Sequence, residues 1–177
     1  LNKQGGKKRT NYNNLSIKDL KTSGLTISPY SSELDNTTLK DYYIMGSYNS
    51  CCGGDNYNDF VDINVLKEVI GIGVRVIDLE IYSIDNKPHV SYSTLKQYDS
   101  MESKPMLLVD TCKRIITDGF ITDNGADPLL LHLRIKSKNP GIFEKIGEIL
   151  KRECGTRLHK GKVTGDTLLS DIKGRLV

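Results

Sequence analysis

This 177-residue sequence has no long apolar run, no strong excess of one charge and no cysteine spacing typical of disulfides. No apolar stretch approaches the roughly 20 residues that cross a bilayer, and no signal peptide is recognisable, so we expect membrane contact, if any, only through the surface. The 25 basic and 22 acidic residues nearly cancel, so the composition makes nucleic acid an unlikely partner. Four cysteines without a C-x-x-C pair or a disulfide-rich spacing indicate a reduced, intracellular protein that is not secreted.

The chain divides by composition into a polar beginning and an α/β remainder. Residues 1–36 read as a basic, polar arm and connector, in which a short helix begins after Ser16 and ends at Gly24. Residues 37–177 alternate strand and helix patterns, which predicts one domain of largely parallel α/β construction.

The strand predicted for residues 74–83 carries two carboxylates on one face. Because side chains alternate across a strand, Asp78 and Glu80 share a face while Ile77 and Leu79 share the other. Sites in parallel α/β folds lie at the carboxyl ends of strands, which makes both acids candidate site residues. The alternative is a pair of solvated strand-end acids, one of them paired with Arg75.

The remaining elements follow from the same patterns. Strands are predicted for residues 41–46, 89–93 and 129–135, with a further strand beginning in residues 172–177. Helices are predicted for residues 59–70, 105–119 and 139–154, with Leu107, Cys112, Phe143 and Cys154 among their inward positions. These pieces amount to the first half to two-thirds of a TIM-barrel-like fold, and we expect the barrel to be truncated at its C-terminal end.

Four of these segments together resemble the X domain of phosphatidylinositol-specific phospholipase C. Residues 39–50 read LKDYYIMGSYNS where the family has roughly L-x-D-Y-x-I-x-x-S-H-N-T, and residues 73–80 read GVRVIDLE where it has G-x-R-x-x-E-L-D. Residues 88–93, PHVSYS, resemble the family's P-x-V-x-H-G, and residues 128–134, PLLLHLR, resemble P-x-x-L-x-L-E. The resemblance covers about residues 37–177 in the family's order, and it implies the fold of the phospholipase-C-like phosphodiesterases.

The same resemblance implies that the catalytic machinery is altered. The family cleaves phosphodiesters by acid–base catalysis with two histidines, and Tyr48 and Tyr92 stand at those two positions. Tyrosine, with an ordinary pKa near 10, is a poor base at neutral pH, and each lost acid–base partner costs roughly 10²- to 10⁴-fold in rate. The two rings either donate hydrogen bonds to a phosphate or pack in a plugged barrel mouth.

The family's calcium ligands are altered as well. Asn49 matches one ligand, Asp78 and Glu80 exchange the family's Glu and Asp, and Arg134 stands where a further Glu is found. Asn49, Asp78 and Glu80 can together hold Ca²⁺ or Mg²⁺ through oxygen, whereas Arg134 would oppose a metal and bind a phosphate or pair with Glu80. We favour the salt bridge and expect that no cofactor is required.

His132 is the only histidine that we expect to point into the barrel, one layer below Arg134. It either replaces a lost catalytic base or is a hydrogen-bonded core histidine. A narrower resemblance, in residues 47–52, 77–88 and 169–177, is to phospholipase-C-like proteins carried by large DNA viruses of protists and algae.

Two functions remain open. The first is a non-catalytic binding or structural protein, such as a virion component, with a viral or host protein or a phospholipid headgroup as partner. The second is a divergent, metal-dependent phosphoric diester hydrolase acting on a phospholipid or another phosphodiester.

Overall fold

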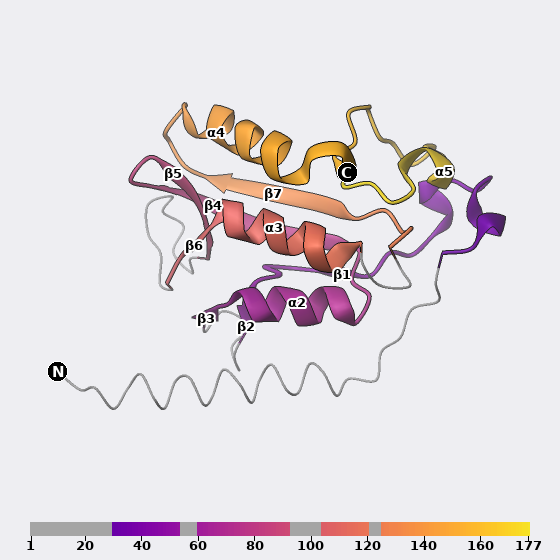
Figure 1. Ribbon diagram of the computed structural model, residues 1–177, viewed down its shortest axis with the longest axis horizontal. Helices are drawn as coiled ribbons and strands as arrows, with labels where there is room; N and C mark the ends of the chain where they lie inside the picture. The colour runs from indigo at the N-terminus through magenta and orange to yellow at the C-terminus, as the bar shows by residue number, and fades with distance from the viewer. Residues whose placement is uncertain (1–29, 54–59, 93–103, 121–124) are drawn as a thin grey trace.

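The structure, a computed structural model, describes residues 30–53, 60–92, 104–120 and 125–177. A curled mixed sheet contains β1 (Gly46–Ser47), β4 (Val76–Ile84), β5 (Lys87–Ser91), β6 (Met106–Leu107) and β7 (Leu130–Lys136), and a separate pair contains β2 (Cys52–Gly53) and β3 (Phe60–Val61). Three helices, α2 (Ile63–Gly71), α3 (Leu108–Gly119) and α4 (Ile142–Ile149), lie side by side along one face of the larger sheet (Figure 1). The predicted basic arm and the helix after Ser16 lie outside the described residues.

Strand β4 is the centre of the larger sheet. It pairs in parallel with β1 and along its length with β7, and it pairs in antiparallel fashion with β5. The register with β7 places Asp78 opposite His132 and Glu80 opposite Arg134. Residues directly opposite on neighbouring strands share a face, so this register alone brings the predicted site residues together. The predicted separation of faces is confirmed, with Ile77, Leu79 and Ile81 in the hydrophobic core.

The expectation of largely parallel construction is wrong for the strand predicted at residues 89–93, which corresponds to β5. Strands β4 and β5 form an antiparallel hairpin closed by Asp85 and Asn86, whose φ angles are 47° and 60°. Two consecutive residues with positive φ make the tight turn whose twist suits a two-residue hairpin, and Asp and Asn tolerate that conformation. Strand β6 then adds to β5, also antiparallel, so Met106 and Leu107 pair with β5 before helix α3 begins at Leu108.

Several predicted boundaries shift for local reasons. The strand predicted at residues 41–46 is confined to Gly46–Ser47, and residues 39–41 form the short 3-10 helix η2 (Leu39–Asp41), at whose start the Asp41 carboxylate accepts from the Thr38 N–H (2.8 Å). Helix α2 begins at Ile63, where the side chain of Asp62 accepts a hydrogen bond from the Asn64 N–H as an N-cap.

The helices bury most of the predicted apolar positions. Ile142, Ile146 and Ile149 of α4 are buried, and Cys112 and Cys154 are buried as predicted. Two positions are wrong: Phe143 is 58% exposed, and Leu107 lies exposed at the end of β6. Phe143 follows Ile142 by one residue, a rotation of 100° on a helix, which moves it away from the face that packs on the sheet. After Ile149 the helix continues as η3 (Leu150–Cys154), a π-helical turn, and Gly155 ends it with φ +50°.

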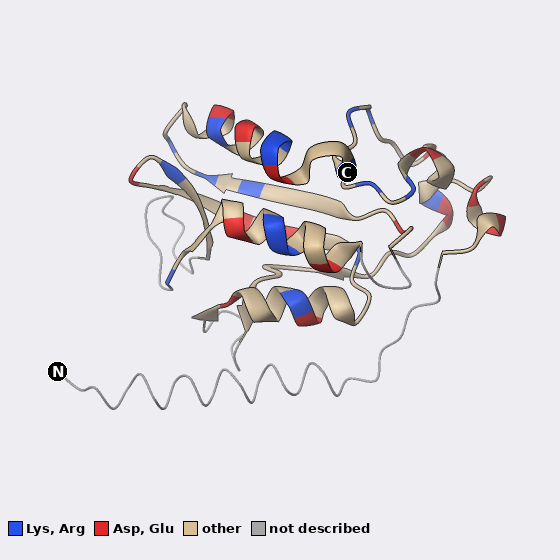
Figure 2. Ribbon diagram, in the orientation of Figure 1, with Lys and Arg blue, Asp and Glu red and all other residues tan. Residues whose placement is uncertain are grey.

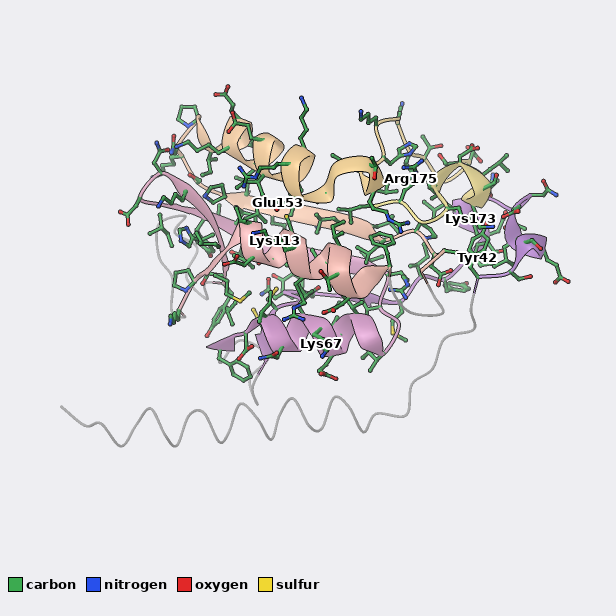
Figure 3. The ribbon with its side chains drawn as sticks, in the orientation of Figure 1. Tyr42, Lys67, Lys113, Glu153, Lys173 and Arg175 are labelled. Atoms are coloured by element: carbon green, nitrogen blue, oxygen red, sulfur yellow. The ribbon has the colours of Figure 1, made fainter. Side chains whose placement is uncertain are left out.

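The two ends of the described chain lie together beyond the amino ends of the strands. Leu39 N–H donates to Thr167 O (3.0 Å) and Lys40 N–H to Gly165 O (2.8 Å), near helix α5 (Leu169–Ile172). Figure 3 shows Tyr42 and Lys173 at this same end. The predicted final strand is present as parallel bridges of Leu176 to Leu129 and Leu158.

Arg75 lies near this end and not at the site. Its Nε is 3.6 Å from Asp127 Oδ2, so the suggested pairing of Arg75 with Asp78 or Glu80 is wrong. Burial is the main cause that lowers the pKa of Arg75 and raises that of Asp127, since each charge is taken out of water.

Charged residues of both signs are interspersed over the helices (Figure 2). The described helices therefore carry both signs of charge, in keeping with the nearly balanced composition. Within the described residues, no helix combines the length and the apolarity needed to cross a bilayer.

Candidate functional site

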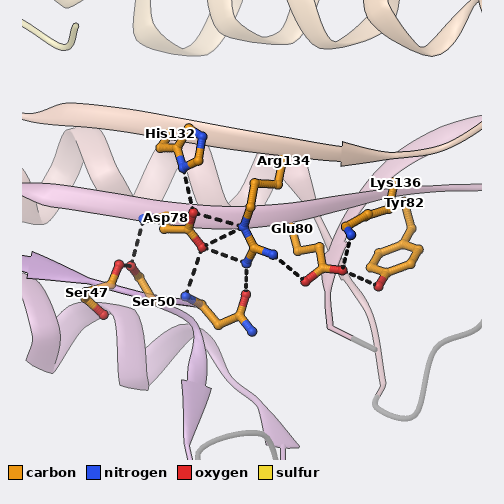
Figure 4. Close-up of polar contacts among 9 residues, drawn as sticks. Ser47, Ser50, Asp78, Glu80, Tyr82, His132, Arg134 and Lys136 are labelled. Atoms are coloured by element: carbon orange, nitrogen blue, oxygen red, sulfur yellow. Dashed lines mark hydrogen bonds and ion pairs between the residues drawn. The ribbon is translucent and has the colours of Figure 1, made fainter. Parts of the chain in front are cut away.

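The candidate site is a polar cluster formed by the loop after β1 and by side chains along β4 and β7, on the side of the sheet away from the helices (Figure 4). It contains the residues singled out from the sequence on these strands, together with residues that contact them through the side chains of Ser50, Tyr82 and Lys136 and through the backbone carbonyl of Ser47. Asn49, Asp78 and Glu80 are all buried, with 5%, 6% and 5% of their surfaces exposed. Buried charges need partners, so the contacts of this cluster decide what it can do.

The loop after β1 is fixed against β4 by its backbone and by Ser50. Ser50 N–H donates to Asp78 O (2.8 Å), and Asp78 N–H donates to Ser50 Oγ (2.9 Å). Ser50 Oγ in turn donates to Ser47 O (3.0 Å). Asn49 has a φ of 47°, a left-handed conformation that Asn tolerates better than most residues, and its N–H donates to Asp78 Oδ1 (3.0 Å). The short loop therefore delivers both the N–H and the side chain of Asn49 to the acid pair.

Arg134 lies at the centre of the cluster. Its Nε is 3.1 and 3.0 Å from the two carboxylate oxygens of Asp78, and one terminal nitrogen is 2.7 Å from Asp78 Oδ1. The other terminal nitrogen donates to Glu80 Oε2 (3.0 Å). Arg134 also donates to Asn49 Oδ1. The favoured Arg134–Glu80 salt bridge is confirmed, and the structure adds a closer, forked contact with Asp78 that the sequence did not indicate.

The other side chains of the cluster surround this ion pair. Tyr82 OH donates to Glu80 Oε1 (2.7 Å), and Lys136 Nζ lies 4.0 Å from the same oxygen. His132 Nδ1 lies 2.7 Å from Asp78 Oδ2. The side chain of His132 is 63% exposed, so the alternative of a core histidine is wrong, although its hydrogen bond is present.

Tyr48 and Tyr92, the two tyrosines singled out from the sequence, differ in their surroundings. Tyr48 is 71% exposed, and the Arg134 guanidinium carbon lies 4.3 Å from the centre of its ring, a cation–π arrangement. Tyr92 is buried, with 3% of its surface exposed. Tyr48 thus covers the guanidinium from outside, and Tyr92 belongs to the packed interior.

The charges of the cluster shift one another's ionisation. Burial disfavours the charged form of Asp78, but hydrogen bonds from Arg134, from the Asn49 N–H and from His132 outweigh it and lower the pKa of Asp78. Burial also disfavours the charged form of Arg134, and the two carboxylates outweigh that effect and raise its pKa. Cys52 borders the cluster, where burial and the negative charge of Glu80 raise the pKa of its thiol to about 12. The cluster therefore favours an ionised Asp78 carboxylate held against an ionised arginine.

This shift predicts how stability depends on pH. The pKa of Asp78 is lower in the folded chain than its ordinary value of about 3.9, so the stabilisation is fully present above that value and is lost as pH falls through the folded pKa. We expect the stability difference between the wild-type chain and Asp78→Asn to shrink below about pH 4. Urea unfolding of both proteins between pH 2.5 and 7 measures this, and a constant difference across the range would contradict it.

The predicted metal ligands lie together, but their oxygens face a guanidinium. Asn49 Oδ1, both oxygens of Asp78 and Glu80 Oε2 all accept from Arg134. Elsewhere in the described ranges, too, no three His, Cys, Asp or Glu side chains gather as a metal-binding group. The residues as arranged do not fit a bound divalent cation.

Sequence reasoning missed Ser50 and Tyr82. Tyr82 follows Glu80 by two residues, so strand alternation places it on the same face, and that signal was readable. The role of Ser50 depends on how the loop folds back on β4, which no local pattern shows.

No protein-family model and no curated protein matches this sequence. Solved structures do match: S. officinalis PLC21 with a TM-score of 0.67 and 16% identity, and L. pealei PLC21 with 0.65 and 14%. In both cases the match covers 81% of this chain and 18% of the other. A structure of S. aureus phosphatidylinositol-specific phospholipase C gives a TM-score of 0.46 at 16% identity, covering 81% and 48%.

The likeness to the two PLC21 structures concerns the fold, since identities of 16% and 14% are too low to carry an activity across. The chain spans 18% of the length of either of them. The phospholipase-C-like fold expected from the four sequence segments is confirmed, while the viral resemblance stays a prediction. The described chain therefore has the fold of part of a phospholipase C.

Proposed function

We propose that this chain is a non-catalytic binding or structural protein built on a phospholipase-C-like fold, its sheet being part of a TIM barrel. The observation that carries the proposal is the state of the two positions where the family has histidines. Tyr48 is stacked on a guanidinium and Tyr92 is buried, so neither is placed as an acid or base beside a common substrate position.

The ion pair supports the same proposal. Phosphodiester cleavage needs positive charge where the phosphate develops negative charge, and the Arg134 guanidinium is turned toward Asp78, Glu80 and Asn49. Hydrogen bonds already made to buried carboxylates are costly to give up to a substrate. The polar cluster is thus better suited to a fixed structural role than to catalytic turnover of a phosphodiester.

One observation favours a second candidate, a divergent phosphoric diester hydrolase. His132 Nδ1 lies 2.7 Å from Asp78 Oδ2, and the ring is largely exposed. A carboxylate that fixes a histidine in this way is the arrangement of a general base. If this candidate is correct, the rate of phosphodiester hydrolysis depends on His132.

Hydrolysis assays distinguish the two candidates. We expect the full chain to release no product above the protein-free background from phosphatidylinositol vesicles or from a soluble chromogenic phosphodiester, with EDTA, Ca²⁺ or Mg²⁺ present. His132→Ala is the matched variant, and it should fold normally because the side chain is exposed. Turnover by the wild-type chain that falls by roughly 10²-fold or more in His132→Ala would overturn the proposal in favour of the hydrolase.

A further inference from the structure

We propose that a cavity at the amino ends of β1, β4 and β7 binds an uncharged, largely apolar small molecule through a hydroxyl group that bridges Arg75 and Asp127. The cavity has a volume of about 460 Å³, within the range of roughly 300–1,000 Å³ that is common for small-molecule sites. It shares no lining residue with the polar cluster drawn in Figure 4. The inference therefore goes beyond the proposed function and does not depend on it.

The wall of the cavity is apolar over most of its extent. Its residues come from the segment before β1, from the start of β7 and from helix α5, and they include Leu34, Leu39, Met45, Leu130 and Leu169. Small-molecule sites typically combine such a wall with a few polar groups that fix the orientation of what binds. The wall therefore suits a molecule whose body is a hydrocarbon chain or ring.

Three tyrosines, Tyr30, Tyr42 and Tyr43, belong to the same wall. Tyr30 OH donates to Asp35 Oδ1 (2.7 Å), and the hydroxyls of Tyr42 and Thr37 lie 2.7 Å apart, so both of these tyrosine hydroxyls are already engaged in hydrogen bonds. Their rings offer flat apolar surface. Polar recognition in the cavity is thus left to its two charged residues.

Those two residues, Arg75 and Asp127, contact each other incompletely. The Arg75 side chain is 7% exposed, and its Nε is buried without a hydrogen-bond partner in the part of the chain that the structure describes. Asp127 Oδ2 lies 3.6 Å from this nitrogen, which is too far for a hydrogen bond. A buried N–H group that lacks an acceptor is costly, so the arrangement favours a molecule that brings an acceptor into the cavity.

A hydroxyl group can contact both charged residues at once. Its oxygen accepts from Arg75 Nε–H and its own hydrogen is donated to Asp127 Oδ2, since one oxygen atom can lie within hydrogen-bond distance of two atoms that are 3.6 Å apart. Burial lowers the pKa of Arg75 and raises that of Asp127, as expected for an ion pair with too few polar partners.

The charge of the cavity selects against an acid or an amine. Arg75 and Asp127 balance each other, and the other residues of the wall are uncharged. A charged molecule would therefore be taken out of water without a counter-charge of its own. An aliphatic or aromatic alcohol avoids this cost, which makes it the class of molecule that the cavity fits.

The test is isothermal titration of the full chain at pH 7 with 2-naphthol and with 2-naphthoate. The two probes share one ring system, but only the carboxylate is charged at this pH. We expect 2-naphthol to bind with a dissociation constant of roughly 100 µM, and 2-naphthoate to bind about tenfold more weakly or less tightly still. No binding of 2-naphthol up to about 1 mM, or tighter binding of 2-naphthoate, would overturn the proposal.

Asp127→Asn tests whether the probes bind at the charged pair. The substitution keeps the shape of the side chain and removes its negative charge, so the charge of Arg75 is left without a counter-charge. We expect 2-naphthoate then to bind at least as tightly as 2-naphthol, which reverses the preference of the wild-type chain. An unchanged preference would contradict the role of Arg75 and Asp127.

Two aromatic variants keep the test decisive if Asp127→Asn folds poorly. Tyr43 lines the cavity while its side chain is exposed, so Tyr43→Ala should fold and should weaken 2-naphthol binding by roughly fivefold. Phe143→Ala removes an exposed ring of α4 outside the cavity and should leave the affinity unchanged. Equal affinities of the two variants for 2-naphthol would overturn the proposal.

The outcomes separate the cavity from the proposed function. Phosphodiester hydrolysis by the wild-type chain would overturn the proposed function, whereas the preference for 2-naphthol would stand. Failure of 2-naphthol to bind would overturn the inference about the cavity and leave the polar cluster as described.

Discussion

Arg134→Ala is expected to lower the free energy of unfolding by about 3 kcal/mol, which corresponds to a fall of roughly 10 °C in melting temperature. Arg134 contacts both buried carboxylates, and its removal leaves Asp78 and Glu80 without their central counter-charge. Breaking a buried pair by deleting one partner costs much more than the pair itself contributes, because the remaining charge stays desolvated. Urea unfolding in EDTA at pH 7 measures the change.

A surface arginine provides the matched control. Arg114 pairs with Asp118 across one turn of α3 at 3.3 Å, and both side chains are more exposed than the acids of the cluster. Arg114→Ala should cost about 0.5 kcal/mol or less. If Arg134→Ala and Arg114→Ala cost the same, the cluster is not a buried ion pair that the fold depends on.

Ile142→Ala is expected to lower the free energy of unfolding by about 3 kcal/mol. Ile142 is the first residue of α4, is fully buried, and belongs to the hydrophobic core. Truncation removes buried methyl groups and leaves a cavity between the helix and its neighbours, and both effects destabilise. Chemical denaturation is again the measurement.

The next residue along the chain is the control for this helix. Phe143 is larger, and its place in the predicted apolar stripe would make it the more costly position to truncate. Because 58% of its surface is exposed, we expect Phe143→Ala to cost less than about 1 kcal/mol. A larger loss for Phe143→Ala than for Ile142→Ala would mean that α4 packs on a different face.

Much of the sheet could be predicted because strand periodicity is local. The two faces of β4 follow from alternation of Ile77 and Leu79 with Asp78 and Glu80, and the structure keeps that division. The direction of β5 could not be read in the same way. It depends on the φ angles of Asp85 and Asn86, and the sequence indicated a turn there but not its type.

The site could be predicted as a group but not as a set of contacts. The register of β4 against β7 puts Arg134 opposite Glu80, the pairing that the sequence favoured. The guanidinium nevertheless also contacts Asp78, which lies diagonally across from Arg134, two residues before Glu80 on β4. The arginine side chain is long enough to reach it, and the loop that carries Asn49 adds a further hydrogen-bond acceptor. Contacts of that kind depend on the register and on the loop after β1 together, and no single segment encodes them.

Calorimetric titration of Ca²⁺ and Mg²⁺ into the wild-type full chain tests the central claim most directly. If Arg134 is the cation of the cluster, neither metal should bind up to millimolar concentrations, and Asp78→Asn should behave as the wild-type chain does. Micromolar binding of either metal that Asp78→Asn abolishes would contradict the account, since it would require the guanidinium to leave Asn49, Asp78 and Glu80 in the native protein.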